Sequence, residues 1–345
     1  MSGARRGLRR AALSLLAAVT LNGCGAGYVL RAGYEEARLL WRRQPIATVL
    51  AAPDLDPATR AKLELVEQTR AFAAAQLGLR VGGSYTSLAT VDAGQIVHVV
   101  SAAPRDRLAP LTWWFPIVGE VPYRGYFDRA DAEAFAARLE REGNDTLVRP
   151  AVAFSTLGWF DDPLLSTMLR DDASRLVETV IHELTHATRY VPNHAAFNES
   201  LAMFVGLRGA ERFFAARGDL TVSAGVAARW TDALTFSDAL GVVSARLDTA
   251  YASGVDETQR AALLADLQRQ VAGRQWLTAE YAGFWRRPLN NAVVVHDQLY
   301  ADRLPLFDAA LQCMGGDLRA TLAAILSGVD DAADPFAAVA SLADC

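Results

Sequence analysis

The sequence predicts an α+β fold that is predominantly helical, with a small and mainly antiparallel sheet preceding a helix that begins near residue 171. Two observations predict this arrangement. Between Gly82 and Pro122 the chain is rich in branched and aromatic residues that Gly and Pro interrupt, as in short strands. From Phe197 to the C-terminus the apolar residues recur with a helical period. Strands gathered in one part of a chain and helices in another are typical of α+β domains.

The individual elements follow from periodicity and boundary residues. Residues 25–75 are predicted to be helical. The predicted helices of the first half are Tyr34–Arg43, Asp56–Leu77 and Asp128–Glu142. The predicted β segments are Ile96–Val100, Trp113–Val121 and Thr146–Thr156. Breaks in the helical second half are predicted near Gly218, Gly254, Pro288 and Gly315-Gly316.

The N-terminus has the pattern of a bacterial secretory leader, which predicts that residues 1–23 are removed. Its positive region contains Arg5, Arg6, Arg9 and Arg10, and residues 11–21 form a short apolar run. The segment Leu21-Asn22-Gly23-Cys24 resembles a lipobox, although an ordinary leader with an incidental cysteine is the alternative. Lipidation of Cys24 would anchor the protein to a membrane surface in the cell envelope, facing the periplasm. Gly25, in place of the aspartate that often retains lipoproteins in the inner membrane, favours the outer membrane.

Composition narrows the possible partners. The chain has 34 Lys and Arg against 39 Asp and Glu, a formal net charge of −5, and no basic patch that would favour nucleic acid. After lipidation of Cys24, Cys313 and Cys345 remain, and an oxidising envelope permits them to pair without requiring it. Because no cysteine spacing of the zinc type occurs, a metal here must use nitrogen and oxygen ligands. The sequence leaves protein partners open.

Residues 182–186 read HELTH and carry the strongest chemical signal in the chain. His182 and His186 are spaced i, i+4, so both imidazoles lie on one face of a helix and can reach one metal ion. Glu183 can then sit beside a metal-bound water and accept its proton. The alternative is a helix that carries two histidines by chance.

The same helix has a core-facing stripe and a predicted N-cap. Asp171 or Asp172 is expected to cap it. Its apolar residues follow the spacing i, i+3, i+4, i+7 and are expected to face the core: Val177, Val180, Ile181 and Leu184. The two histidines lie at the edge of that stripe, which is where the wall of a cleft would need them.

A catalytic zinc usually has three protein ligands, so a third is expected nearby. The candidates are His194 and Glu199, and Glu199 is favoured. The metzincin spacing would require a histidine at position 192, which is Pro192. Glu199 begins the next predicted helix, where small or flexible residues such as Gly206 would allow close packing on the first. Two helices that deliver His182, His186 and Glu199 form the gluzincin arrangement, although an acidic residue at a helix start is common without a metal.

These motifs resemble those of bacterial envelope proteins classed as predicted aminopeptidases, a zincin group with HExxH followed by FNESxA. Here the second motif is FNESLA at residues 197–202. Further similarity covers RQPI at 43–46, WFPIVG at 114–119, YRGYF at 123–127, STLGWFDDPLL at 155–165 and NNA at 290–292. The resemblance implies a zincin-like, gluzincin-type fold, one Zn²⁺ ion and a peptide substrate. The sequence lacks the Gly-x-Met-Glu-Asn segment with which well-known gluzincin aminopeptidases bind a free amine, so "peptidase" is better supported than "aminopeptidase".

Several further residues are candidates for roles around the metal. Tyr123, Arg124 and Tyr126 are predicted donors to the oxyanion of the tetrahedral intermediate, with His194 as another and a turn with buried tyrosines as the alternative. The segment Ala151–Thr156 is the candidate substrate-binding strand. Candidates for orienting the histidines or binding substrate are Glu178, Asp161, Asp162, His194 and Asn198. Asp161-Asp162-Pro163 fits a capped turn equally well, and Asn290-Asn291 reads as a helix cap more readily than as a substrate contact.

Together these features predict a zinc-dependent, aminopeptidase-like peptidase in the bacterial envelope. We expect a single catalytic domain over residues 24–345, with a helical part (24–80), an α/β part (81–170), metal-binding helices (171–217) and a helical C-terminal part (218–345). One alternative is a non-catalytic envelope lipoprotein that uses a zincin fold for binding or scaffolding. Another is an endopeptidase that acts on envelope proteins or cell-wall peptides.

Overall fold

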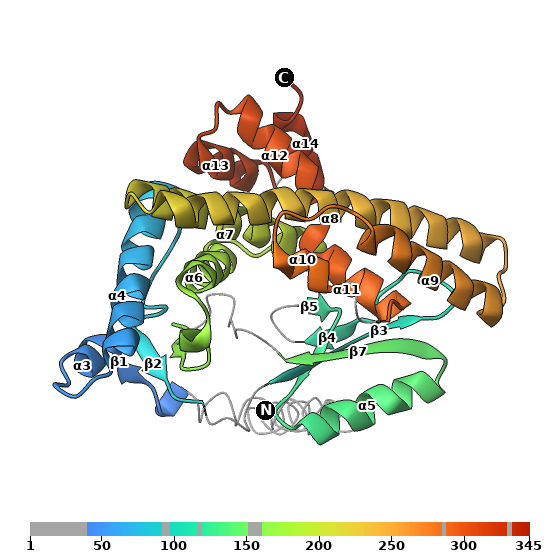
Figure 1. Ribbon diagram of the computed structural model, residues 1–345, viewed down its shortest axis with the longest axis horizontal. Helices are drawn as coiled ribbons and strands as arrows, with labels where there is room; N and C mark the ends of the chain where they lie inside the picture. The colour runs from blue at the N-terminus through green and yellow to red at the C-terminus, as the bar shows by residue number, and fades with distance from the viewer. Residues whose placement is uncertain (1–39, 92–96, 116–118, 151–160, 285–287, 330–332) are drawn as a thin grey trace, which may run out of the picture.

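The computed structural model describes residues 40–91, 97–115, 119–150, 161–284, 288–329 and 333–345 (Figure 1). The predicted leader, the lipidation site Cys24 and most of the predicted helix Tyr34–Arg43 lie outside these residues. The candidate substrate strand Ala151–Thr156 also lies outside them. Within the described part, the fold is α+β and predominantly helical, as predicted.

The first long helix confirms the prediction for Asp56–Leu77. Helix α4 (Pro57–Phe72) has Asp56 as its N-cap, whose carboxylate accepts a hydrogen bond from the Thr59 amide at 2.8 Å. A π-helical turn (Ala73–Leu77) continues it to Gly78, whose φ of +72° suits glycine at a helix end. A short helix, α3 (Ile46–Leu50), precedes it.

Three small sheets occupy the described part of the chain. Strand β1 (Gln44–Pro45) pairs antiparallel with β2 (Ser87–Ala89), and β2 pairs parallel with β8 (Leu164–Leu165). Strand β3 (His98–Pro104) lies between β6 (Arg124–Tyr126) and β7 (Asn144–Pro150), both antiparallel to it. Strands β4 (Trp113–Phe115) and β5 (Gly119–Val121) form an antiparallel pair. The segment predicted at Trp113–Val121 is therefore two paired strands.

The sheet of β3, β6 and β7 lies between two helices (Figure 1). Helix α5 (Arg129–Arg141), predicted at Asp128–Glu142, covers one face. The apolar residues expected to face inward are buried there: Ala132, Phe135, Ala136 and Leu139. Helix α11 (Asn291–Ala301) covers the other face and also packs on α7. The second face of the sheet therefore borders the main helical core.

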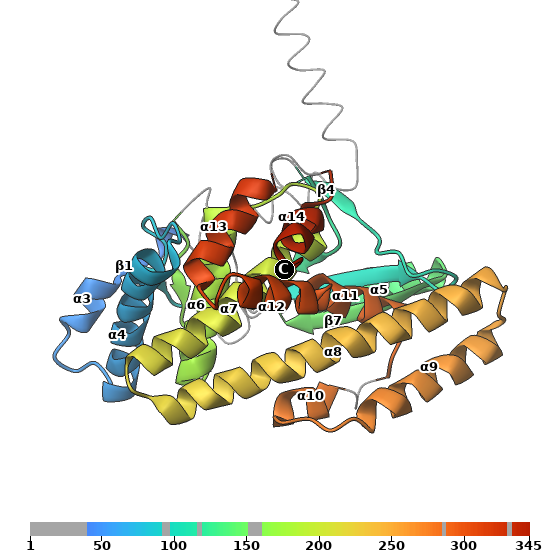
Figure 2. The same ribbon diagram turned by 90° about the horizontal axis from the view of Figure 1, so that it is seen from above.

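The second half is helical, with breaks at the four predicted places and, among the described residues, three further breaks, after Ala272, Ala301 and Gly328, that were not predicted. Its helices are α6 (Ala173–Thr188), α7 (Ala195–Ala216), α8 (Leu220–Ala252), α9 (Glu257–Ala272), α10 (Ala279–Phe284), α12 (Leu304–Cys313), α13 (Leu318–Gly328) and α14 (Pro335–Leu342). A 3₁₀ turn (Met168–Arg170) precedes α6. Helix α8 runs the length of the molecule with α9 beside it, and α12 to α14 lie on its far side from the sheet (Figures 1 and 2).

Helix α6 begins at the second of the two predicted caps. The Asp172 carboxylate accepts hydrogen bonds from the amides of Ser174 at 2.9 Å and Arg175 at 3.1 Å. The predicted core stripe is fully buried. Helix α7 packs directly on α6 because glycine faces the contact. A Cβ on Gly206 would lie 3.2 Å from the Glu178 carbonyl oxygen and 3.3 Å from the His182 Cβ.

The C-terminal tail is tied back to the last helices. Cys313, at the end of α12, forms a disulfide with Cys345, which settles the pairing that the sequence left open. No helix among the described residues is long and apolar enough to cross a membrane.

Candidate metal centre

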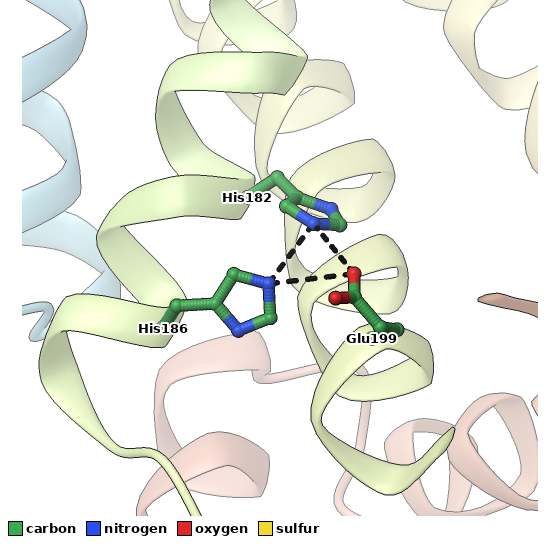
Figure 3. A group of neighbouring side chains, drawn as sticks. All are labelled: His182, His186 and Glu199. Atoms are coloured by element: carbon green, nitrogen blue, oxygen red, sulfur yellow. Dashed lines mark hydrogen bonds and ion pairs between the residues drawn. The ribbon is translucent and has the colours of Figure 1, made fainter. Parts of the chain in front are cut away.

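Three side chains from α6 and α7 converge on one point (Figure 3). The Nε2 atoms of His182 and His186 lie 3.1 Å apart. The Oε2 atom of Glu199 lies 3.3 Å from Nε2 of His182 and 3.5 Å from Nε2 of His186. Among the described residues this is the one group of at least three metal-ligating side chains that comes together in this way.

The two helices place the group through local spacing and a short connection. His182 and His186 are one turn apart on α6, and Glu199 lies in the first turns of α7. Asn198 fixes the connection between the helices. Its side-chain oxygen accepts a hydrogen bond from the Val191 amide at 2.9 Å, and its side-chain nitrogen donates to the Val191 carbonyl at 2.7 Å. This pair of bonds holds the start of α7, and with it Glu199.

Burial and charge set the protonation of the group. The side chains of His182, His186 and Glu199 are 17%, 5% and 13% exposed. Desolvation alone would raise the pKa of Glu199, but the two histidines hold that pKa well below its ordinary value. Desolvation opposes the charged form of His182, but the hydrogen bond to Glu199 and the charges of Glu183 and Glu199 outweigh it, so the His182 pKa is raised.

The donor set fits a zinc ion. Zinc binds imidazole nitrogen and carboxylate oxygen at about 2.0–2.2 Å in tetrahedral geometry, which places neighbouring ligand atoms roughly 3.3 Å apart. The three observed separations of 3.1 to 3.5 Å agree with this value. The lone pairs of two imidazole nitrogens and one carboxylate oxygen also point to one place, where a bound cation would be stabilised.

Glu183 follows His182 on α6 and is partly buried. Burial raises its pKa, while the two neighbouring histidines act in the opposite direction, and the net pKa is raised. Glu199 and the buried Asp162 act on the Glu183 carboxyl and add to that rise. A carboxyl group with a raised pKa beside a metal site is suited to accept and release a proton.

Tyrosines surround the group. The ring of Tyr300, on α11, stacks on His182 with centroids 6.3 Å apart, and the ring of Tyr190 lies 6.5 Å from that of His186. Tyr123 lies just before β6, and burial together with the negative charge of Glu199 raises its pKa. The same two causes raise the pKa of Tyr190 to about 12. These phenols are therefore neutral hydrogen-bond donors near neutral pH.

The structure separates the predicted oxyanion donors into two sets. The negative charge of Glu199 contributes to the raised pKa of Tyr123. Arg124 and Tyr126 instead contact Phe135 of α5: the Arg124 guanidinium lies 4.9 Å from that ring, and the Tyr126 ring lies 5.4 Å from it. Both therefore belong to the face of the sheet opposite α11. His194 is the N-cap residue of α7, and its charge acts on Asp334 near α14.

The other candidates take mainly structural positions. Glu178 forms ion pairs with Arg229 at 2.8 Å and Arg175 at 3.6 Å. The Asp161 carboxylate accepts a hydrogen bond from the Gly83 amide at 2.8 Å, so it joins two distant segments; strand β8 follows, and the predicted capped turn before a helix is not found among these described residues. The backbone of Asp162 bonds to Ser84 and Tyr85.

The pair at positions 290 and 291 begins α11. Asn290 is the N-cap, and its side chain accepts a hydrogen bond from the Val293 amide at 2.9 Å. The side-chain nitrogen of Asn291 donates to the Pro104 carbonyl at 2.8 Å. The bond from Val293 confirms Asn290 as a helix cap, and Asn291 joins α11 to strand β3.

Three residues near the group were not anticipated from the sequence: Tyr190, Tyr300 and Arg149. Tyr190 lies four positions after His186, but α6 ends at Thr188 and Arg189 is extended, so helical spacing does not predict its position. Tyr300 and Arg149 are 151 positions apart, yet the Arg149 guanidinium donates a hydrogen bond to the Tyr300 hydroxyl at 3.1 Å. No local pattern marks either residue.

Comparison with known proteins gives a family. No curated protein and no solved structure matches the chain. A family model matches residues 27–331, which includes the two helices of the metal centre and Tyr300. Because this match covers far more than half of the chain, the protein belongs to the family described as "Putative aminopeptidase".

Proposed function

We propose that the protein is a zinc-dependent peptidase with a zincin-like, gluzincin-type centre. The observation that carries the proposal is the convergence of His182, His186 and Glu199, with Glu183 between the two histidines in sequence. The family supports a peptide substrate. Three protein ligands, as opposed to four, leave the fourth coordination position of a zinc ion open for the water that catalysis requires.

A zinc ion held by these three residues would act as a Lewis acid and would acidify a bound water to a pKa of about 7. Glu183 accepts the proton of the attacking water and delivers it to the amine that leaves. The phenols of Tyr123, Tyr190 and Tyr300 are the donors best placed to hydrogen-bond the oxyanion as the peptide carbonyl becomes tetrahedral.

The proposal includes a location. The leader and the lipobox ending at Cys24 support a lipid-anchored protein of the bacterial envelope that faces the periplasm. The Cys313–Cys345 disulfide supports the same location, because disulfides persist in oxidising compartments.

The rival is a non-catalytic lipoprotein that uses the same fold for binding or scaffolding. Two observations favour the enzyme. A structural zinc site would be expected to have four protein ligands, and His194 does not join the other three. Glu183 would also have no purpose as a proton acceptor in a purely structural site. Cleavage within a chain, as opposed to release of its end residues, would make the protein an endopeptidase acting on envelope proteins or cell-wall peptides.

The test is cleavage of a peptide library by the zinc-loaded protein, followed by mass spectrometry of the products. We expect cleavage by the wild type and a loss of about 100-fold or more in Glu183→Gln, with zinc content unchanged. Glu133→Gln, an exposed carboxylate of α5, is the matched control and should keep full activity. A protein that holds zinc but cleaves nothing, or a fully active Glu183→Gln, would contradict the proposal.

A further inference from the structure

We infer that Arg149 binds a carboxylate of the substrate, so that the site takes peptides with a free C-terminal carboxylate close to the bond that is cleaved. The inference rests on the proposed peptidase function and specifies which end of the substrate is recognised. It differs from the preference that the family description suggests, which is for a free amine.

The sheet and α11 hold Arg149 beside the metal centre. Arg149 lies near the end of β7, and its neighbour Val148 packs on the other face with α5. Its guanidinium donates a hydrogen bond to the Tyr300 hydroxyl at 3.1 Å and lies 5.7 Å from the centre of that ring. Tyr300 in turn stacks on His182. One tyrosine thus connects the guanidinium to a metal ligand.

The charge of Arg149 has no protein partner in the described part of the chain. No described carboxylate lies within ion-pair distance of it, and its buried Nε atom has no hydrogen-bond partner there. Two buried arginines of the core, by contrast, have carboxylate partners: Arg229 contacts Glu178 and Arg260 contacts Asp145. A partly buried guanidinium without an anion is costly unless a ligand supplies one.

The acidic groups near the metal centre do not offer an equivalent site for an amine. Glu199 is a metal ligand and Glu183 is the proton acceptor. Glu178 is neutralised by Arg229 and Arg175, and Asp162 is 2% exposed. The unmatched charge at this site is therefore positive. A planar guanidinium binds a carboxylate through two parallel hydrogen bonds, which selects this group over an amide.

Distance limits the length of the fragment that is released. Successive separations of 6.3 Å from the His182 ring to the Tyr300 ring, and 5.7 Å from there to the guanidinium, place Arg149 no more than about 12 Å from His182. An extended peptide spans at most about 3.3–3.6 Å per residue. The carboxylate that reaches Arg149 therefore lies within about three residues of the cleaved bond.

The test measures binding, so that it does not depend on turnover. A hydroxamate joined to dialanine, which attaches to zinc at one end, is prepared with a free carboxylate and with an amide at the other end. Calorimetry on the zinc-loaded protein should give at least about tenfold tighter binding of the acid, since hydrogen bonds to charged groups are the strong ones. Equal affinities for the two compounds would overturn the inference.

Variants assign the effect to Arg149. In Arg149→Gln the preference for the acid should disappear, while binding of the amide changes little. Arg129→Gln, an exposed arginine of α5, is the matched control and should keep the preference. Tyr300→Phe removes the hydroxyl that orients the guanidinium and should reduce the preference without abolishing it. If Arg149 only supports the fold, Arg149→Gln would instead weaken the binding of the acid and of the amide equally, which would contradict the inference.

A second readout separates this inference from the proposed function. A tetrapeptide library is offered with each end free or blocked. Cleavage that requires a free amine and tolerates a C-terminal amide would overturn the role of Arg149 and leave the peptidase intact. Absence of both zinc and cleavage in every form would overturn the proposed function itself.

Discussion

Two carboxylates of the proposed metal centre lie within one helix pair and have opposite environments. Burial raises the pKa of both Glu199 and Glu183. Glu199 contacts both histidines directly, and their charge reverses the effect of burial, so that its pKa is lowered. The charges of the two histidines offset the effect of burial on Glu183 only in part, so its pKa stays raised. Two acids whose pKa values are pushed apart in this way suit different roles, one as a charged ligand and the other as a proton acceptor.

Asn198 gives a prediction at the scale of one residue. Asn198→Ala leaves the partly buried amide and carbonyl of Val191 without their partners, and each such group costs about 1–3 kcal/mol. We expect the free energy of unfolding to fall by roughly 2–4 kcal/mol and zinc to bind more weakly, because Glu199 follows immediately. Urea unfolding and a zinc titration measure the two effects.

A matched variant separates the two hydrogen bonds of Asn198. Asn198→Asp keeps the acceptor for the Val191 amide and loses the donor to its carbonyl. Its second carboxylate oxygen would face the Val191 carbonyl oxygen at a buried position, so Asn198→Asp should be destabilised at least as much as Asn198→Ala. Wild-type stability in Asn198→Ala would contradict the role assigned to this side chain.

The sequence predicted that His182, His186 and Glu199 come together because their signal is local. His182 and His186 are four positions apart on one helix, and Glu199 begins the next. Arg149 and Tyr300 come together only because β7 and α11 are packed face to face, a contact between segments 151 positions apart. Such a contact leaves no pattern in either segment.

At the scale of elements, the site depends on how closely α6 and α7 approach. Gly206→Ala would place a methyl group 3.2 Å from the Glu178 carbonyl and 3.3 Å from the His182 Cβ, so the helices must move apart. We expect zinc affinity to fall by about tenfold, the lower end of what is usual when groups behind a metal ligand are disturbed. Isothermal titration with zinc measures this change.

Gly225 supplies the control for that substitution. It lies in α8, where an added Cβ would meet nothing within 4 Å. Gly225→Ala should therefore stabilise the protein by about 0.5–1 kcal/mol, the ordinary gain from replacing glycine within a helix. Zinc affinity should stay unchanged in this variant. If both glycine variants bind zinc like the wild type, close packing is not what positions His182.

The N-cap of α6 predicts a dependence on pH. Burial opposes the charge of Asp172, but hydrogen bonds from Ser174 and Arg175 outweigh it and lower its pKa below the ordinary 3.8. Its stabilising effect is therefore present above pH 3.8 and is lost as the pH falls through the lower pKa of the folded state. Asp172→Ala should cost about 1 kcal/mol at pH 7 and progressively less below pH 3.8.

Urea unfolding at pH 7 and pH 3 tests the cap. Asp172→Asn is the matched variant, because asparagine caps a helix nearly as well and carries no titrating group. Its stability relative to Asp172→Ala should change little between the two pH values. A cost of Asp172→Ala that is the same at both would contradict the assignment.

The sequence predicted elements where one chemical pattern extends over several turns. The helices at Pro57–Phe72 and Arg129–Arg141 have clear caps and apolar stripes, and the structure confirms both. The sequence did not predict the sheet of β1, β2 and β8, whose strands have two or three residues each. Strands this short have too few residues to show alternation, and they are defined only by hydrogen bonds to distant segments.

At the scale of the whole molecule, the disulfide closes the C-terminal helices into one unit. Cys313 and Cys345 are 32 positions apart, and α13 and α14 lie between them. Closing a loop of this length stabilises a protein by about 2–4 kcal/mol, mainly by restricting the unfolded chain. The double variant Cys313→Ser, Cys345→Ser should be less stable by that amount in chemical unfolding.

A reductant provides the control for the double variant. Wild-type protein unfolded in the presence of a strong reductant should match the double variant, since both lack the bond. The double variant itself should not respond to the reductant. If oxidised wild type and double variant unfold at the same urea concentration, the two cysteines are not paired in the folded protein.

The most direct test of the proposed metal centre is the zinc content of the purified protein, measured by mass spectrometry of the metal against protein concentration. We expect one zinc ion per chain in the wild type. Glu199→Ala should lose most of the metal, because only two ligands remain, and Glu183→Gln should keep it. A wild type without zinc, or a Glu199→Ala variant that retains a full equivalent, would contradict the metal centre of His182, His186 and Glu199.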